Sequence, residues 1–165
     1  MTMAYDERVL VSFSVPSEPG NERLALARVA DAVSGCGLSS DQVDRLKTAV
    51  AEATMNAIEH GNHNQPDVDV DVTVAALDDG VAVSIVDRGG AHAPAPDAGV
   101  ELPDLDMKLA GLQTPRGWGL FLIQNMVDAM DVSIDGDLHT VRLVMRSQPT
   151  PRPRDPEGGP RAEQV

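Results

Sequence analysis

The sequence from residue 39 to residue 62 reads SSDQVDRLKTAVAEATMNAIEHGN. Ser39 and Gln42 have the spacing of a capping box, in which each side chain pairs with the backbone N–H of the other residue. The apolar residues that follow recur every three or four positions, as on one face of an amphipathic helix: Val43, Leu46, Val50, Ala53 and Ala57. We therefore predict one long helix that begins after Ser39 and continues up to Gly61.

A polar stripe accompanies the apolar one on this helix. At about 100° per residue, Glu52, Asn56 and Glu59 fall within one narrow sector, away from the apolar face. Such a stripe is usually a solvated helix face. Asn is a poor interior helix former, however, because its side chain competes for backbone hydrogen bonds, and its amide oxygen is a suitable Mg²⁺ ligand. The stripe is either solvated surface or part of a site.

Segments of alternating polarity lie on both sides of this helix and predict strands. The predicted strands are residues 9–15, 68–74, 81–85, 132–135 and 138–146. Turn residues Asp79-Gly80 and Asp135-Gly136 join them into two hairpins. Two further helices are predicted, one over residues 26–33 and one over about 117–130. This order predicts an α+β fold, a two-layer sandwich of a mostly antiparallel mixed sheet with the helices on one face.

The chain has 165 residues and reads as one domain over residues 1–146. A segment rich in Gly, Pro, Ala and Asp, about residues 90–115, is too long for a simple connector, and such loops are usually functional. The Pro-rich residues 147–165 are expected to form a disordered tail.

The composition excludes several function classes. Lys and Arg number 13 against 26 Asp and Glu, for a net charge of -13, which repels nucleic acid and anionic membrane surfaces. A single cysteine, Cys36, excludes an internal disulfide. The sequence begins without a signal-peptide pattern and contains no apolar run long enough to span a bilayer. We therefore expect a cytoplasmic protein that binds neither nucleic acid nor membrane.

Two more places could contact a ligand. Asp87 follows a predicted strand on its core-facing side, so it either starts a turn or accepts a hydrogen bond from an exocyclic amine in a pocket. Gly89 and Gly90 would let a ligand approach the backbone there. The segment Arg116-Gly117-Trp118-Gly119-Leu120 opens the third helix, where free N–H groups attract anions, although glycines also open helices after flexible loops.

Together these segments resemble the ATP-binding domain shared by gyrase, Hsp90, histidine kinases and MutL. The closest resemblance is to its small bacterial branch, the anti-sigma factor serine/threonine kinases, and it extends from about Val9 to Arg146. Glu52-x-x-x-Asn56-Ala57-Ile58-x-His60-Gly61 resembles the N-box of this family. Asp87-x-Gly89 resembles its first glycine box, Arg116 to Leu120 its second, and residues 90–115 its ATP lid.

The resemblance implies a Bergerat-type fold with ATP and Mg²⁺ as cofactors. It implies that Asn56 binds Mg²⁺, that Asp87 accepts a hydrogen bond from the adenine amine, and that Glu52 assists phosphoryl transfer. The lid and the second glycine box would wrap the phosphates. The residues that it assigns to cofactor binding are Asn56, Glu59, His60, Asp87, Gly89, Gly90, Arg116, Gly117, Trp118, Gly119, Leu120 and His139.

Two positions depart from the family pattern. Ala91 stands where the first glycine box usually has another glycine. His139 stands where the family commonly has a Thr near the adenine-binding Asp, and strand parity places it on the same side as Val141 and Leu143. His139 therefore either hydrogen-bonds Asp87 or is a partly buried histidine without a ligand role.

The resemblance implies an anti-sigma factor that sequesters a sigma factor and phosphorylates a STAS-type antagonist protein on Ser or Thr. Proteins of this family are commonly dimeric, so a homodimer is a further expectation. The alternative is a non-catalytic ATP-binding module that acts by docking alone, which Ala91 and His139 favour and Glu52 disfavours. A histidine kinase fragment is a third hypothesis, and the absence of a phospho-acceptor helix from the 165 residues counts against it.

Overall fold

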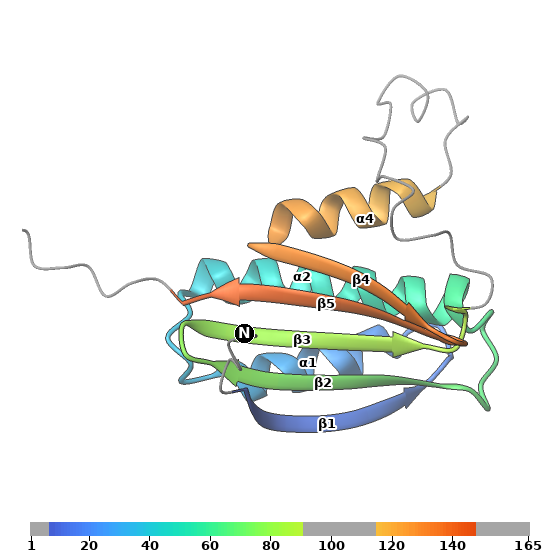
Figure 1. Ribbon diagram of the computed structural model, residues 1–165, viewed down its shortest axis with the longest axis horizontal. Helices are drawn as coiled ribbons and strands as arrows, with labels where there is room; N and C mark the ends of the chain where they lie inside the picture. The colour runs from blue at the N-terminus through green and yellow to red at the C-terminus, as the bar shows by residue number, and fades with distance from the viewer. Residues whose placement is uncertain (1–6, 91–114, 148–165) are drawn as a thin grey trace, which may run out of the picture.

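The computed structural model of the chain describes residues 7–90 and 115–147, with only the backbone described for residues 115–120 (Figure 1). The predicted lid and the predicted tail therefore lie outside the described residues, apart from Gly90, Pro115 and Ser147. Ala91 lies outside them as well.

The described residues form five strands, three α-helices and one turn of π-helix. In chain order these are β1 (Arg8–Pro16), α1 (Glu22–Val33), α2 (Ser40–Asn56), the π-helical turn η1 (Ala57–Gly61), β2 (Asp69–Leu77), β3 (Gly80–Asp87), α4 (Pro115–Met126), β4 (Ala129–Asp135) and β5 (Leu138–Arg146).

The strands form one sheet in the order β1-β2-β3-β5-β4. The predicted two-layer α+β architecture is confirmed, because α1 and α2 pack on one face of this sheet and α4 lies beside α2 and β4 (Figure 1). The sheet is predicted to be mixed and mostly antiparallel, and among the described strands all four neighbouring pairs are antiparallel. Two hairpins and a return of the chain beside β3 produce this arrangement without a parallel crossover.

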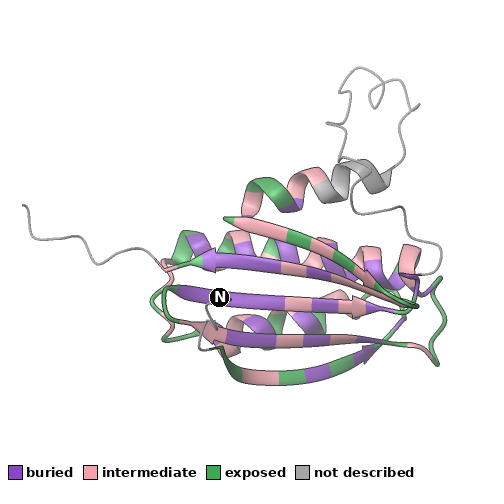
Figure 2. Cartoon of the chain, viewed as in Figure 1, coloured by how far each residue is buried: buried purple, intermediate pink, exposed green. Residues whose placement is uncertain are grey.

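The core lies between the sheet and the helices. Aromatic residues make up only 2% of the chain, so aliphatic side chains fill this space. Nine apolar residues on the helix-facing side of the three central strands are buried: Val70, Val72, Val74, Val81, Val83, Ile85, Val141, Leu143 and Met145. Figure 2 shows these buried positions recurring along β2, β3 and β5. The alternation that predicted the strands thus marks the face that α1 and α2 cover.

The capping box at the start of α2 is present as predicted. The Ser39 hydroxyl accepts a hydrogen bond from the Gln42 backbone N–H at 3.1 Å, and the Gln42 side-chain oxygen accepts one from the Ser39 N–H at 3.0 Å. The Gln42 amide also donates to the backbone carbonyl of Arg146 at 2.6 Å. One side chain therefore caps α2 and ties its first turn to the end of β5.

The boundary between the third helix and the fourth strand differs from the prediction. Helix α4 ends at Met126 instead of residue 130, and β4 begins at Ala129 instead of residue 132. Pairing with β5 is the reason, because Asp128 N–H donates to the Val144 carbonyl at 3.0 Å and Met130 lies opposite Leu143. The apolar residues near 127–130 fit a helical period, but the sheet supplies them with hydrogen bonds and a buried neighbour.

We expect Ser39→Ala to lower the free energy of unfolding by about 0.5–2 kcal/mol, the usual loss for an N-cap. The substitution removes the acceptor for the Gln42 N–H. Urea unfolding followed by circular dichroism measures the change. Ser40→Ala is the matched control, because Ser40 is exposed at the first position of α2 and has no role in the cap, so its stability should stay within about 0.5 kcal/mol of wild type.

Candidate functional site

The end of α2 is wider than a regular α-helix. The Asn62 N–H donates to the Ala57 carbonyl at 2.8 Å, five residues back, which makes Ala57–Gly61 a π-helical turn. The predicted helix is therefore regular only as far as Asn56. Single π-turns of this kind often occur at functional sites.

The polar stripe is divided by this change. Glu52 and Asn56 lie one turn apart on the regular part of α2, and both are partly buried. Glu59 lies on the π-turn and is exposed, while His60 beside it is partly buried. The assumption of about 100° per residue holds between Glu52 and Asn56 and fails beyond them.

The carboxylate of Asp87 is buried at the end of β3. The strand continues through Asp87, which is only 4% exposed, so its side chain faces the helix layer instead of starting an exposed turn. Its Oδ1 accepts a hydrogen bond from the Gly89 N–H at 2.8 Å. A carboxylate can be buried at acceptable free-energy cost only when such partners are present.

His139 supplies the second partner of this carboxylate. It lies directly opposite Asp87 in the β3–β5 register, and its Nδ1 is 3.0 Å from Asp87 Oδ2. An ionised carboxylate can only accept, so Nδ1–H is the donor and Nε2 is free of that bond. Of the two alternatives for His139, the structure shows the hydrogen bond to Asp87, and the side chain of His139 is 15% exposed against 5% for that of Asp87.

Glycines let three backbone segments meet around Asp87. A Cβ atom at Gly61 would lie 2.2 Å from Asp87 Cγ, and one at Gly89 would lie 2.5 Å from the Gly61 carbonyl oxygen. The Gly90 N–H donates to the Asp137 carbonyl at 2.8 Å, which joins the loop after β3 to the β4–β5 turn. Gly89 and Gly90 thus allow close approach of this chain's own backbone, besides any approach of a ligand.

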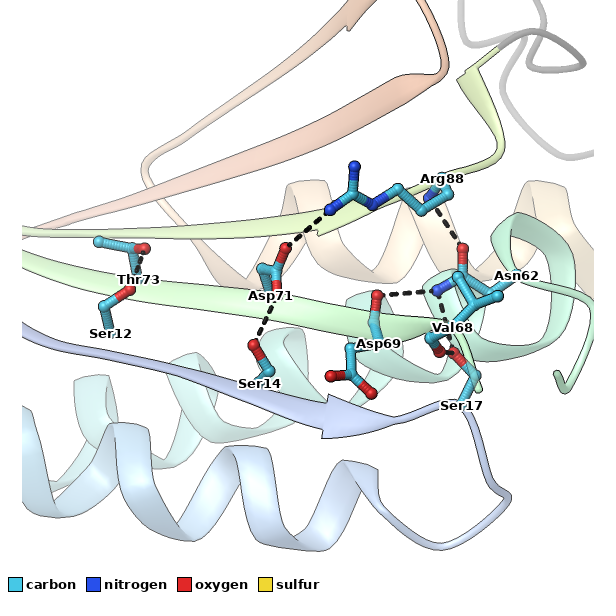
Figure 3. Close-up of polar contacts among 9 residues, drawn as sticks. All are labelled: Ser12, Ser14, Ser17, Asn62, Val68, Asp69, Asp71, Thr73 and Arg88. Atoms are coloured by element: carbon cyan, nitrogen blue, oxygen red, sulfur yellow. Dashed lines mark hydrogen bonds and ion pairs between the residues drawn. The ribbon is translucent and has the colours of Figure 1, made fainter. Parts of the chain in front are cut away.

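Asn62 is a buried polar residue that sequence reasoning missed. It is 3% exposed, and its amide contacts Ser17, Asp69 and Arg88 (Figure 3). The available signal was an Asn directly after the last glycine of the long helix, a position where Asn is also common in ordinary turns. Only the structure shows that this side chain points inward.

Asn56 fits the coordination chemistry of Mg²⁺. The metal ligand would be its oxygen Oδ1, whereas its Nδ2, which can only donate, is buried without a hydrogen-bond partner in the described part of the chain. Within residues 7–90 and 115–147, no group of three or more His, Cys, Asp or Glu side chains could enclose a metal ion. Mg²⁺ at nucleotide sites is held by one or two protein oxygens, by phosphates and by water, and a single amide oxygen suits that mode.

The second glycine box lies inside α4. This helix begins at Pro115, so residues 116–120 form its first turns. Proline is well suited to the start of a helix, and the N–H groups of the first turn have no partner within the helix. Helix α4 packs beside α2, the helix that carries Glu52 and Asn56 (Figure 1).

We expect His139→Ala to lower the free energy of unfolding by about 1–3 kcal/mol at neutral pH, because one oxygen of the buried Asp87 carboxylate loses its donor. Thermal or urea unfolding measures the loss. Thr140→Ala is the control, since Thr140 is the adjacent residue on the opposite face of β5. Equal stabilities of the two variants would show that the Asp87–His139 hydrogen bond contributes nothing.

Comparison with known proteins identifies the family. Residues 15–145 match the family model described as histidine kinase-like ATPase domain. The anti-sigma F factor of Geobacillus stearothermophilus is 31% identical over 128 residues, which cover 74% of this chain and 80% of the relative. The serine-protein kinase RsbW of Bacillus velezensis is 29% identical over 136 residues, with 74% and 76% covered.

Two solved structures share the fold. The SiaB–SiaC complex from Pseudomonas aeruginosa matches with a TM-score of 0.57 and 16% identity, over 84% of this chain and 90% of that one. The RsbU and RsbW domains of a Mycobacterium tuberculosis protein match with a TM-score of 0.58 and 19% identity, over 82% of this chain and 31% of that one. None of the described helices is long and apolar enough to cross a membrane. The chain belongs to the histidine kinase-like ATPase family, in its branch of anti-sigma factor serine/threonine kinases.

Proposed function

We propose that this protein is an anti-sigma factor that binds a sigma factor and uses Mg²⁺ and ATP to phosphorylate an antagonist protein on Ser or Thr. One observation carries the proposal: Glu52 lies one helical turn from Asn56, whose amide oxygen is a suitable Mg²⁺ ligand, and both residues are only partly buried. A proton acceptor thus accompanies a candidate metal ligand on one face of α2. The family match supports ATP as the cofactor.

The nucleotide would lie between α2, the end of β3 and the start of α4. Asp87 would accept a hydrogen bond from the adenine amine, Asn56 would hold Mg²⁺, and the first N–H groups of α4 would face the phosphates. The other residues that we assign to this site are Glu59, His60, Gly89, Gly90, Arg116, Gly117, Trp118, Gly119, Leu120 and His139. ATP supplies the phosphoryl group that is transferred.

Glu52 is the proposed catalytic residue. In phosphoryl transfer the protein mainly positions the reactants and stabilises charge, and a suitably placed carboxylate orients or deprotonates the attacking hydroxyl. Glu52 is partly buried and has no ion-pair partner among the described residues, so its carboxylate is available to a Ser or Thr hydroxyl of the antagonist.

The proposed partners follow from the relatives. Proteins named anti-sigma F factor and serine-protein kinase RsbW are similar to this chain over about three quarters of its length. A sigma factor and a STAS-type antagonist are therefore the proposed partners, and a sigma factor would place the protein in the cytoplasm. A homodimer and an ATP lid over about residues 90–115 complete the proposal.

The non-catalytic module remains the second candidate, and one observation favours it. Both oxygens of Asp87 already accept hydrogen bonds from this chain, Oδ1 from Gly89 and Oδ2 from His139. An adenine amine must share one of these oxygens through a remaining lone pair. Incubation with Mg²⁺, ATP and the antagonist encoded beside the gene, followed by intact mass of the antagonist, separates the candidates: a gain of one phosphoryl group supports the kinase, and partner binding without that gain supports the module.

We expect Asn56→Ala to remove Mg²⁺-dependent ATP binding while the fold is retained, because the substitution deletes the proposed metal ligand. Isothermal calorimetry with and without Mg²⁺ measures the affinity. Thr48→Ala, at an exposed position about two turns earlier on α2, is the control and should bind as wild type does. Equal affinities of wild type and Asn56→Ala would contradict the assignment of Asn56.

We expect Glu52→Gln to slow antagonist phosphorylation by about 100-fold or more, the usual scale for a general base, with little change in ATP affinity. Gln keeps the size of the side chain and removes its ability to accept a proton. Asp44→Asn makes the same carboxylate-to-amide change at an exposed position of α2 and should leave the rate unchanged. A Glu52→Gln protein as fast as wild type would exclude a catalytic role for Glu52.

A further inference from the structure

We propose that Asn62 is a positioning residue, which holds the peptide after Asp87 so that the Asp87 carboxylate can distinguish the base of the nucleotide. This inference rests on the proposed function, in which Asp87 accepts a hydrogen bond from an exocyclic amine. Three sets of contacts support it: those of the Asn62 amide, those of the Asp87–Arg88 peptide, and the packing of Gly61 against the carboxylate.

The contacts of Asn62 determine the orientation of its amide. The Ser17 hydroxyl donates to the Val68 carbonyl at 2.5 Å, so its oxygen accepts from Asn62 Nδ2 at 2.9 Å. The same nitrogen donates to the Asp69 carbonyl at 3.2 Å. Oδ1 therefore faces the Arg88 N–H, which donates to it at 2.8 Å (Figure 3). A rotation of the amide by half a turn would oppose donor to donor and acceptor to acceptor.

The anchors of Asn62 lie in two places that are far apart in the chain. Ser17 directly follows β1 and is completely buried, and Asp69 is the first residue of β2. The amide therefore spans from the β1–β2 end of the sheet to the residue after β3 (Figure 3). Because both N–H groups are held, Oδ1 cannot follow Arg88 if that residue moves.

The Arg88 N–H belongs to the peptide group that joins it to Asp87. Asn62 thus restrains the backbone on one side of the carboxylate, while the Gly89 N–H and His139 Nδ1 hold its two oxygens. Gly61, the residue before Asn62, packs so closely on Asp87 that a Cβ there would lie 2.2 Å from Cγ. The hydrogen bond to Asn62 and the packing of Gly61 both arise at the C-terminal end of the π-turn.

The Arg88 side chain contributes less to this restraint. Its Nη2 lies 3.7 Å from Asp71 Oδ2, and Asp71 Oδ1 accepts from the Ser14 hydroxyl at 2.5 Å. Both members of the Arg88–Asp71 ion pair are half exposed, and such pairs contribute only about 0–1 kcal/mol. The partly buried bond that the Arg88 N–H donates to Asn62 Oδ1 is therefore the main restraint on residue 88.

A positioning role predicts an effect that depends on the base. ATP carries the amine that Asp87 would accept from, whereas inosine triphosphate carries a carbonyl oxygen at that position. Loss of the Asn62 restraint should therefore weaken ATP binding and leave inosine triphosphate binding almost unchanged. A residue that only stabilises the fold would weaken the binding of both nucleotides equally.

The test compares Asn62→Ala with wild type by calorimetry, using the full chain, Mg²⁺ and each nucleotide. We expect the ATP affinity to fall about tenfold, as for one hydrogen bond, and the affinity for inosine triphosphate to change less than about threefold. In an Asp87→Asn background the same substitution should have no further effect on ATP, because the two residues act through one contact. Hydrogen exchange at the Arg88 amide should become faster in Asn62→Ala.

Asn21→Ala is the matched control. The Asn21 amide also donates to a backbone carbonyl, that of Pro16 at the end of β1 at 2.8 Å, and its bond does not involve Arg88. In Asn21→Ala, the ratio of ATP to inosine triphosphate affinity should equal that of wild type. Ser17→Ala removes one anchor of the Asn62 amide and keeps the bond between Asn62 and Arg88, so it should lower the ratio of ATP to inosine triphosphate affinity by a few-fold. This variant tests the same role if Asn62→Ala does not fold.

Equal losses for the two nucleotides in Asn62→Ala, or in Ser17→Ala if the first variant does not fold, would overturn the positioning role. Equal binding of ATP and inosine triphosphate by wild type would also overturn the positioning role, because Asp87 would then not distinguish the two bases. A wild-type protein that binds neither nucleotide would instead overturn the proposed function itself.

Discussion

The burial of one carboxylate, that of Asp87, is the constraint on which the site end of this structure depends. A charged group in the protein interior is strongly unfavourable unless hydrogen-bond donors surround it. The chain provides these donors from two segments, the Gly89 backbone and the His139 ring. The β3–β5 register and the turn after β3 must therefore form together, because each supplies one donor.

The end of the long helix meets this constraint from the other side. A regular α-helix ends at Asn56, and the π-turn that follows brings Gly61 against the carboxylate and directs Asn62 into the interior. The chain then leaves through His63 and Asn64, both with positive φ, a conformation that His and Asn adopt more readily than most residues. The helix that carries Glu52 and Asn56 is thus joined to Asp87 through a few close contacts. A proposed catalytic residue, a proposed metal ligand and a proposed base acceptor share one framework.

Asp87 also illustrates why a family motif does not by itself define a binding pose. In this chain a histidine occupies the position opposite Asp87, and it is more exposed to solvent than the carboxylate that it contacts. A neutral imidazole with Nδ1–H toward Asp87 leaves Nε2 as an acceptor. In the proposed site, a base would meet both the carboxylate and the ring. Its recognition would then depend on the Asp87–His139 pair and on the hydrogen bond between Asn62 and the Arg88 N–H.

The sequence by itself determined the capped helix α2, the alternating strands with their aliphatic core, the two-layer architecture and the core-facing side of Asp87 and His139, because periodicity and capping are local properties. Only the tertiary structure decided that residues 129–131, which fit a helical pattern, belong to β4, because they pair with residues of β5 that are distant in the sequence. It also decided that the helix widens after Asn56 and that Asn62 is buried. The burial of Asn62 depends on contacts with Ser17, Asp69 and Arg88, and no local pattern encodes which distant groups will surround a polar side chain.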